Sequence, residues 1–417
     1  MSRTRQAMAL TAGALITAVA LAGCSSKAEV ASGDSNDGSI ATDVGVTDTT
    51  ITLGALTDQS AVYAALGTTL VQGNQLYFDQ RNADGGICGR EVELEVRDHA
   101  SDVQTAVTQF NELEPEILGF VQLLGSPQVN AVKGDIESGD VPTFIASWSS
   151  DFLGSDPIAI AGTLYPIDVV NGLQHLMDEG MIAEGDTIGH VHFPGDFGEN
   201  ALLGSQYFGE QSGIDVTAVM VEPTATDLTA QVTELADAGV SAVVVSAGPR
   251  QTASVAALTT ALGLDVPILS NGPGFDPALL DTPAAQALLD RLYVSVSYAP
   301  FASDGEEAQA IAAGFEELSP ANGPTIFVNY GYAVASIFGQ ALDVACEAGD
   351  LTREGVVTAL RSLSAVETGI FPELNFEDPD RSTSLDSFIL RASAETPGGL
   401  VIEQEPFHSP YAETFSE

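Results

Sequence analysis

The sequence predicts an α/β protein with two Rossmann-like lobes, each organised around a parallel sheet. Short apolar segments typical of buried strands alternate with helical segments along nearly the whole chain. Polar loops follow the ends of these strands, which is where parallel β/α sheets present ligand-binding groups. About 390 of the 417 residues follow an N-terminal leader, and this length favours two hydrophobic cores over one.

The stretch from position 50 to position 98 shows the repeating unit most clearly. Ile51–Leu56 is short, apolar and rich in β-formers, and the polar loop Thr57–Ser60 follows it. Apolar residues then recur at helical spacing until the turn Asn82–Gly86 ends the helix. Glu91–Val96 alternates polar and apolar residues, as a second strand does. The unit is therefore strand, loop, helix, turn and strand.

The same alternation continues toward the C-terminus. Ser101 is the expected N-cap of the next helix. The further strands are expected at Phe120–Leu124, Val141–Ala146, Thr187–Phe193, Val216–Val221, Ala242–Ser246, Val266–Leu269 and Leu292–Ser297. The helices between them include Ala131–Ser138, Asp168–Glu179, Leu228–Ala238, Ala253–Leu262 and Thr325–Ala348. In the tail, Ile370–Phe376 and Ser387–Leu390 are expected to return to the second lobe as antiparallel strands.

Residues 1–24 have the features of a targeting segment. Arg3 and Arg5 precede the apolar run Ala7–Ala22, which is too short to favour a spanning helix. Leu21-Ala22-Gly23-Cys24 resembles a lipobox, so Cys24 is predicted to be lipidated and to anchor the protein to the outer face of the cell membrane. The alternative is an ordinary signal peptide with an incidental cysteine. Residues 25–45 have the composition of a flexible tether.

The chain is strongly acidic, with 58 acidic and 13 basic residues and a formal net charge of -45. Such a surface repels nucleic-acid phosphates and anionic lipid, so neither is an expected partner. The acidic residues are expected to form a solvated surface rather than cation sites. A hydrophobic content of 45% supports a substantial buried core.

Two cysteines remain after Cys24 is set aside for lipid. In an exported protein, Cys88 and Cys346 are predicted to form one disulfide. Cys88 lies in the turn before the second strand, and Cys346 lies near the end of a long helix expected in the same lobe. The alternative is two free buried thiols.

The order of these elements resembles the branched-chain amino-acid-binding proteins, which are type I periplasmic solute-binding proteins of ABC importers. The turn in the first unit reads RNADGGICGREVEL, similar to the N-x-x-GGI-x-G turn of family members. The resemblance runs from about Val46 to about Phe407 and implies a three-strand hinge. Its crossings are expected near Tyr165, Tyr298 and Ser364–Gly369. The first lobe would then hold residues 46–165 and 299–364, and the second lobe residues 166–298 and 365–417.

The resemblance also implies ligand-binding residues in the first lobe. Tyr63, Ser126, Ser147 and Ser149 stand where family members bind the carboxylate and amino groups of an amino acid. The serines follow successive predicted strands, so their hydroxyls are expected to gather at one edge of the sheet. Taken singly, each serine also suits a helix cap or a turn.

The second lobe departs from the family pattern. Family members carry an acidic residue for the ligand's ammonium where this chain has Asn271-Gly272-Pro273-Gly274, and Phe197 replaces a family tyrosine. A buried, unpaired ammonium costs several kcal/mol, so an amide, a carboxylic acid or an aromatic compound fits as well as an amino acid. Asp196 or Asp276 would be the substitute carboxylate. Trp148, the single tryptophan, is expected to stack on the ligand; packing is its alternative role.

No catalytic motif is present in the sequence. It contains no G-x-S-x-G, Walker A, G-x-G-x-x-G or H-E-x-x-H pattern. His190 and His192 would face one side of a strand, but no third ligand is evident, so neither a metal nor a cofactor is expected.

The expected function is that of an extracytoplasmic, lipid-anchored receptor for an ABC importer. Its lobes would close on an amino-acid-like, amide or aromatic or carboxylic solute and present it to the membrane permease. The chain is expected to act as a monomer. The alternatives are a ligand-sensing receptor that signals and an enzyme built on the same fold.

Overall fold

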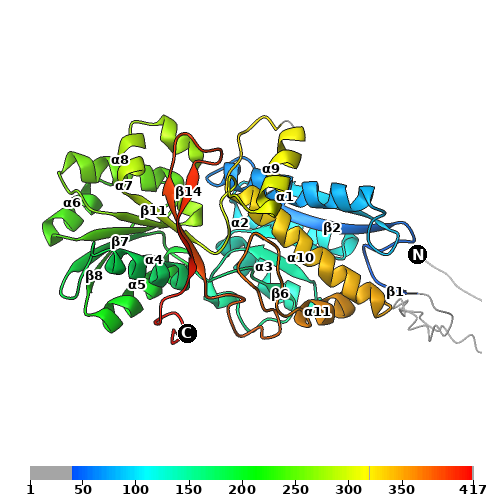
Figure 1. Cartoon of the computed structure of the whole chain (residues 1–417). Helices are drawn as coiled ribbons and strands as arrows, with labels where there is room; N and C mark the ends of the chain where they lie inside the picture. Colours follow the sequence, from blue (N-terminus) through cyan, green and yellow to red (C-terminus); the bar gives the residue numbers. More distant parts are fainter. Residues whose placement is uncertain (1–39, 319, 416–417) are drawn as a thin grey trace, which may run out of the picture. The chain divides into compact units, whose positions relative to one another are not determined.

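The computed structural model describes residues 40–318 and 320–415. The predicted leader 1–24 with Cys24, and most of the predicted tether 25–45, lie outside the described residues. The described chain forms two lobes, each with its own sheet and flanking helices (Figure 1). Among these residues, no helix has the length and hydropathy required to cross a membrane.

The first lobe contains a five-stranded parallel sheet in the order β3-β2-β4-β5-β6. Its strands are β2 (Thr50–Thr57), β3 (Glu91–Asp98), β4 (Gly119–Leu124), β5 (Thr143–Ala146) and β6 (Ile158–Ala159). Its helices are α1 (Ala64–Ala83), α2 (Val103–Leu113), α3 (Ser126–Ser138), α9 (Glu306–Glu317), α10 (Phe327–Glu347) and α11 (Arg353–Arg361), with 3-10 turns at Glu114–Glu116 and Ser150–Phe152. A small parallel pair joins β1 (Ala41–Thr42) to β12 (Asp350–Leu351).

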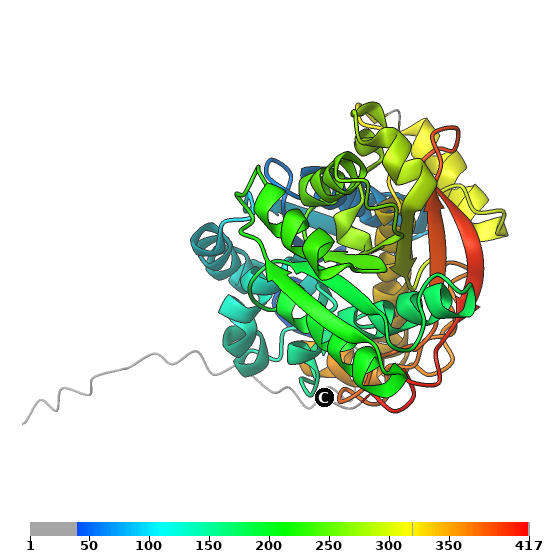
Figure 2. The same ribbon diagram turned by 90° about the vertical axis from the view of Figure 1, so that its left-hand side faces the viewer.

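The second lobe contains a seven-stranded sheet in the order β14-β13-β11-β10-β9-β7-β8. Its strands are β7 (Thr187–His192), β8 (Asp215–Met220), β9 (Ala242–Ser246), β10 (Ile268–Asn271), β11 (Leu292–Val296), β13 (Ser387–Ala392) and β14 (Leu400–Phe407). Its helices are α4 (Tyr165–Asp178), α5 (Gly198–Ser212), α6 (Thr229–Ala238), α7 (Pro249–Ala261) and α8 (Ala285–Arg291), with 3-10 turns at Gly272–Gly274 and Pro277–Asp281. The predicted antiparallel return of β13 is confirmed by its pairing with β11, and β14 lies at the edge of the sheet (Figure 2).

The chain crosses between the lobes at residues 160–164, 297–300 and 382–386. The first and third crossings are bonded to each other, because the Gly162 N–H donates to Thr383 Oγ1 at 2.9 Å and this hydroxyl donates to Ile160 O at 3.0 Å. The third crossing lies later than predicted. The preceding segment packs on the first lobe, where Phe376 contacts Phe144 at a centroid distance of 5.9 Å.

Three predictions about elements are wrong in detail. Asp102, not Ser101, caps α2, since its carboxylate accepts the Thr105 N–H at 2.7 Å. Ile370–Phe376 forms no regular strand, because only one isolated bridge pairs Val366 with Leu374. Helix α3 begins at Ser126, five residues before the predicted start, which places its first turn at the end of β4.

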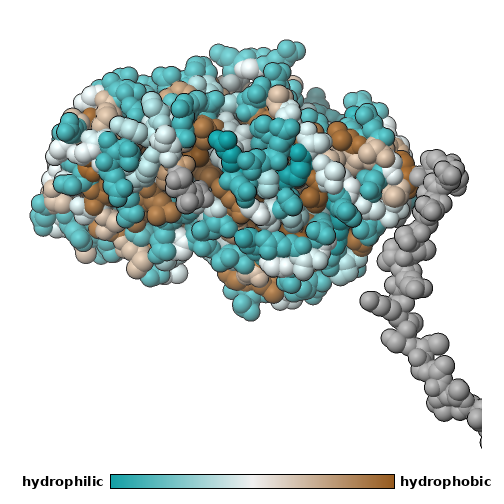
Figure 3. Space-filling model, turned by 90° about the horizontal axis from the view of Figure 1, so that it is seen from below, coloured by the Kyte–Doolittle hydropathy of each residue, from teal (hydrophilic) through white to brown (hydrophobic). Residues whose placement is uncertain are grey.

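Cys88 and Cys346 form the predicted disulfide, with their Cα atoms 6.2 Å apart. It joins the turn before β3 to the last turn of α10, so both of its ends belong to the first lobe. The surface seen in Figure 3 is mostly hydrophilic, with hydrophobic residues in scattered patches, as the acidic composition predicts.

Candidate functional site

A cavity of about 160 Å³ lies between the two lobes. Its walls are largely apolar, and none of the side chains that form them is an aspartate, glutamate, lysine or arginine. The first lobe contributes Val62, Tyr63, Leu66, His99, Ser101, Leu124, Gly125, Ser126, Pro127, Gln128, Ala146 and Trp148; Tyr165 and the second lobe's Phe193, Pro194, Phe197, Pro223 and Pro273 complete the lining.

The loop between β2 and α1 is fixed by a buried carboxylate. Asp58 is fully buried, and one of its oxygens accepts the N–H groups of Ser60 and Ala61 at 3.1 and 2.7 Å. The other oxygen accepts the Tyr63 N–H at 2.9 Å and the Ser101 hydroxyl at 2.5 Å. Both oxygens are therefore occupied, and Asp58 holds the backbone that carries Tyr63 to the cavity wall.

The first turn of α3 forms another part of the wall. Gly125 is its N-cap, and φ there is +99°, a conformation in which a Cβ would also lie 2.3 Å from Gln128 Oε1. Glycine supplies no side chain to bond the first amides of the helix. In this first turn Pro127 has no N–H, so the amides without partners within the helix are those of Ser126 and Gln128, and the helix dipole places partial positive charge there. This wall can therefore receive an anion without a lysine or arginine.

Hydroxyl groups stand beside this helix end. Ser126 Oγ and Ser147 Oγ lie 2.6 Å apart, so one donates to the other. Burial raises the pKa of the Tyr165 phenol above its ordinary range; hydrogen bonds with the Trp148 backbone and with the two serines counteract part of this. Burial likewise raises the pKa of Tyr63. These hydroxyls are therefore neutral and available as hydrogen-bond donors.

His99 is the one titratable nitrogen base in the lining, and the backbone fixes its neutral form. The Ser101 N–H donates to Nδ1 at 3.0 Å, which leaves the proton on Nε2 to donate to Leu124 O at 3.0 Å. Burial lowers the pKa of His99, although Asp58 opposes this. His99 therefore supplies neither a positive charge nor a free nitrogen to a ligand.

Trp148 and Phe197 contribute aromatic surface from the two sides of the cleft. Trp148 is 3% exposed, and its Nε1–H donates to Ala161 O at 3.2 Å. Its ring packs edge-on against Tyr330 at a centroid distance of 5.1 Å, so its packing role is evident as well as its place in the wall. The Phe197 ring lies 4.6 Å from the Tyr165 ring, which begins α4 of the same lobe.

Four of the seven predicted ligand residues line the cavity, namely Tyr63, Ser126, Trp148 and Phe197. The other three are buried behind it. Ser147 supports Ser126, Ser149 donates to Asp151 Oδ2 at 3.0 Å, and Asn271 Oδ1 accepts the Ser246 hydroxyl at 2.7 Å. Their hydroxyl or amide groups are used within the fold.

Asp196 and Asp276, the carboxylates suggested as partners for a ligand's ammonium group, do not line the cavity. Burial, together with the charges of Asp151 and Glu199, raises the pKa of Asp196. Asp276 caps a 3-10 turn by accepting the Ala278 N–H at 2.8 Å, and it lines a smaller hollow that adjoins the cavity but not the cavity itself.

The two strand histidines have structural partners. His190 bonds Ser205 and Ser246 at 2.8 and 2.9 Å, and burial lowers its pKa to about 3. Within the described chain, no group of three or more histidine, cysteine or acidic side chains is arranged to hold a metal ion.

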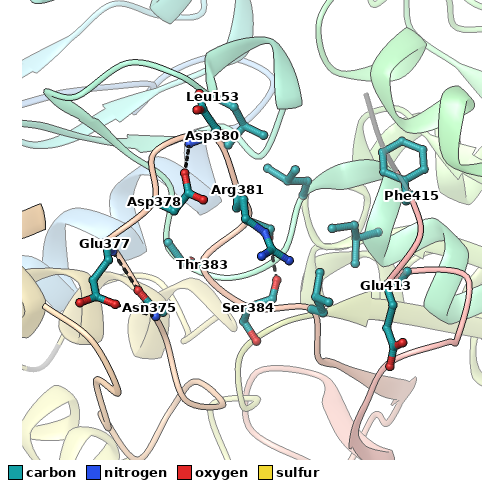
Figure 4. A pocket seen from close by; sticks show the side chains of 15 residues that line it. Leu153, Asn375, Glu377, Asp378, Asp380, Arg381, Thr383, Ser384, Glu413 and Phe415 are labelled. Carbon is teal, nitrogen blue, oxygen red and sulfur yellow. Dashed lines mark hydrogen bonds between the residues drawn. The ribbon is translucent and has the colours of Figure 1, made fainter.

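A larger hollow of about 610 Å³ lies beside the third crossing (Figure 4). Its lining is mixed: Arg381, Asp378, Asp380 and Glu413 contribute charged groups, and several leucine, isoleucine and phenylalanine side chains contribute apolar surface. None of the predicted ligand residues reaches this hollow, and it is formed mainly by residues 375–385 and the end of the chain. The cavity between the lobes is therefore the better candidate.

Residues 50–397 match the family model described as "Periplasmic binding protein". The chain belongs to the periplasmic binding protein family. Its two lobes have the type I fold of these proteins, so the resemblance inferred from the sequence is confirmed. The family consists of extracytoplasmic solute-binding proteins of ABC transporters, not of enzymes. A sequence search among curated proteins finds no match.

Solved structures show the same relationship. The fatty acid ABC transporter substrate-binding protein from Thermomonospora curvata is 39% identical with a TM-score of 0.88, over 90% of this chain and 97% of that chain. A branched-chain amino acid ABC transporter protein from Thermus thermophilus with bound valine is 20% identical, with a TM-score of 0.77, over 88% and 99%. A solute-binding protein from Rhodopseudomonas palustris HaA2 in complex with p-hydroxybenzoic acid is 18% identical, with a TM-score of 0.73, over 86% and 97%. The last two show the shared fold alone.

Proposed function

We propose that this protein captures a small carboxylic acid with an apolar body and delivers it to an ABC importer. The observation that carries the proposal is the cavity between the lobes, whose walls are apolar and hold no fully charged side chain. The carboxylate would dock at the first turn of α3 beside the Ser126 hydroxyl, and Tyr63 offers a second neutral hydroxyl from the β2–α1 loop in the same lining. Apolar contacts with Trp148 and Phe197 would enclose the rest of the ligand.

The cavity also argues against an amino acid. An ammonium group bound there would need an acceptor with negative charge, and none lines the walls. Asp58, whose carboxylate fixes the loop that carries Tyr63, already accepts four hydrogen bonds. The relative named as a fatty acid transporter's binding protein, at 39% identity, supports the same ligand class.

The cavity volume bounds the ligand in this conformation. An apolar cavity of about 150 Å³ holds benzene, so about 160 Å³ suits a ligand body of roughly six carbon atoms. Closure of the lobes about the three crossings would then enclose the ligand, and the closed form would engage the permease. The protein would act as a monomer.

Mass spectrometry of small molecules released from the purified protein tests the ligand class. A carboxylic acid without an amino group is the expected result. Leucine, isoleucine or valine released in stoichiometric amount would refute it.

The membrane anchor is a separate part of the proposal. Lipid on Cys24, with residues 25–45 as the tether, would keep the binding lobes beside the permease. Cys24→Ala is expected to release the protein from the membrane fraction or to stop its processing. An acylated, membrane-bound variant would refute the anchor and leave the ligand proposal intact.

A further inference from the structure

The cavity between the lobes has a smaller neighbour. A second hollow of about 10 Å³ shares four lining residues with the cavity, namely Val62, Tyr63, Leu66 and Pro273. These residues stand between the two spaces, so the spaces are neighbouring parts of one cleft. The second hollow is almost filled by side chains.

The lining of the second hollow is mixed, because Asp276 and Thr325 contribute polar groups beside its apolar side chains. Pro249 and Phe275 of the second lobe and Phe327 of α10 contribute to its walls. Val62, at its rim, is 39% exposed. A ligand tail that passed the four shared residues would meet apolar surface on both lobes.

Leu66 is held firmly by the fold. It is 6% exposed and lies in the first turn of α1. The next residue, Gly67, lies so close to the preceding loop that a Cβ would be 2.0 Å from Asp58 O. The helix start is therefore pressed against a loop that Asp58 fixes, and the Leu66 side chain cannot retreat by a shift of the backbone.

We infer that Leu66 limits the length of the acyl chain that this protein accepts. This inference rests on the proposed function. A linear carboxylic acid bound with its head at α3 would extend its tail toward Leu66, and a chain longer than the cavity would collide with that side chain. Removal of the side chain joins the two hollows and admits a longer tail.

The test compares linear acids of six, eight, ten and twelve carbon atoms, titrated below their micellar concentrations. Trp148 is the single tryptophan and lines the cavity, so its fluorescence reports binding, and calorimetry gives the affinity. The unaltered protein is expected to bind hexanoate and octanoate and to bind dodecanoate more weakly. Leu66→Ala is expected to raise the affinity for dodecanoate relative to hexanoate at least tenfold, and Leu66→Val by a smaller factor.

Leu70→Ala is the matched control. Leu70 lies one turn further along α1 and is 1% exposed, but it lines neither hollow, so its loss tests for general damage to the helix. If the short acids bind and both Leu66 variants keep the original length profile, the inference is wrong while the proposed function stands. The inference is also wrong if Leu70→Ala changes the affinity for long acids relative to short acids as much as the Leu66 variants do. If no acid binds to the unaltered protein or to any variant, the proposed function fails and the inference fails with it.

Discussion

Asn200 of the second lobe and Ser150 of the first lobe bond each other twice across the cleft. The Asn200 Nδ2–H donates to Ser150 Oγ at 2.5 Å, and the Ser150 N–H donates to Asn200 Oδ1 at 3.2 Å. Both residues are buried, and neither lines the ligand cavity. These bonds therefore hold the lobes together without touching the ligand.

Asn200→Ala is expected to weaken ligand binding by about 1–2 kcal/mol, roughly 5- to 30-fold, because it removes two bonds between the lobes. Titration with 4-methylpentanoate measures the effect. Asn111→Ala, on an exposed face of α2, removes an amide that bonds only Val107 O and should leave the affinity unchanged. Equal affinities for Asn200→Ala and the unaltered protein would show that these bonds do not contribute to closure.

Ser147 and Ser149 offer a matched pair of substitutions. Both are fully buried, but Ser147 bonds Ser126 in the cavity wall, whereas Ser149 caps the 3-10 turn Ser150–Phe152. Ser147→Ala should weaken binding by about 0.5–1.5 kcal/mol, since Ser126 loses its partner. Ser149→Ala should change the dissociation constant less than twofold. The same loss of affinity in both variants would contradict the site geometry.

The pH dependence of stability should report on Asp168 at the hinge. Its carboxylate accepts hydroxyl bonds from Thr163 at 2.5 Å and from Ser387 at 2.8 Å, which connects the first crossing to the start of β13. Burial raises the pKa of Asp168 to about 7, and these hydroxyl bonds counteract part of the rise. Between about pH 4 and pH 7 the folded protein therefore binds a proton that the unfolded chain releases.

Because the folded protein binds more protons than the unfolded chain in this range, the free energy of unfolding falls as the pH rises. The contribution of Asp168 to the free energy of unfolding is complete below about pH 4, falls as the pH rises to about 7, and is constant above that, a total of about 2–4 kcal/mol. Asp168→Asn should remove this slope in urea unfolding measured from pH 4.5 to 8. Asp178→Asn, at the exposed end of the same helix, should keep it. If the free energy of unfolding depends on pH in the same way in Asp168→Asn and in the unaltered protein, the raised pKa of Asp168 does not cause the slope.

Replacement of Cys88 and Cys346 by serine should lower the free energy of unfolding by roughly 2–5 kcal/mol, because the bridge spans 258 residues of chain. Neither cysteine lines the cavity, so the affinity for ligand should not change. Thermal unfolding with and without reductant, followed by titration, measures both quantities. A double variant as stable as the oxidised protein would contradict the structural role of the bridge.

Sequence reasoning recovered the strands and the disulfide because their signals are local or compositional. The apolar run at Ile51–Leu56 and the residual pair of cysteines depend little on distant contacts. The third crossing was misplaced because the segment that contains Phe376 packs against Phe144. No local pattern encodes that contact.

The candidate site was recovered only in part for the same reason. Ser126 and Ser149 both follow strands, and the sequence around them does not tell their roles apart. Ser126 lines the cavity, whereas Ser149 caps a 3-10 turn. Most of the lining residues were missed as site residues, among them His99, whose role follows from backbone bonds, and Tyr165, which was assigned only to a crossing. The one usable signal was the position of His99 directly after the strand β3, among the residues that follow strand ends.

The most direct test of the account is a calorimetric titration of the purified protein with three ligands that share one carbon skeleton. Leucine, 4-methylpentanoate and 4-methylpentanamide differ only in the ammonium group and in the charge of the head group. Because the cavity offers an anion site at α3 and no partner for an ammonium, 4-methylpentanoate should bind at least tenfold more tightly than leucine, with the amide between them. Leucine binding as tightly as 4-methylpentanoate, or more tightly, would contradict the account.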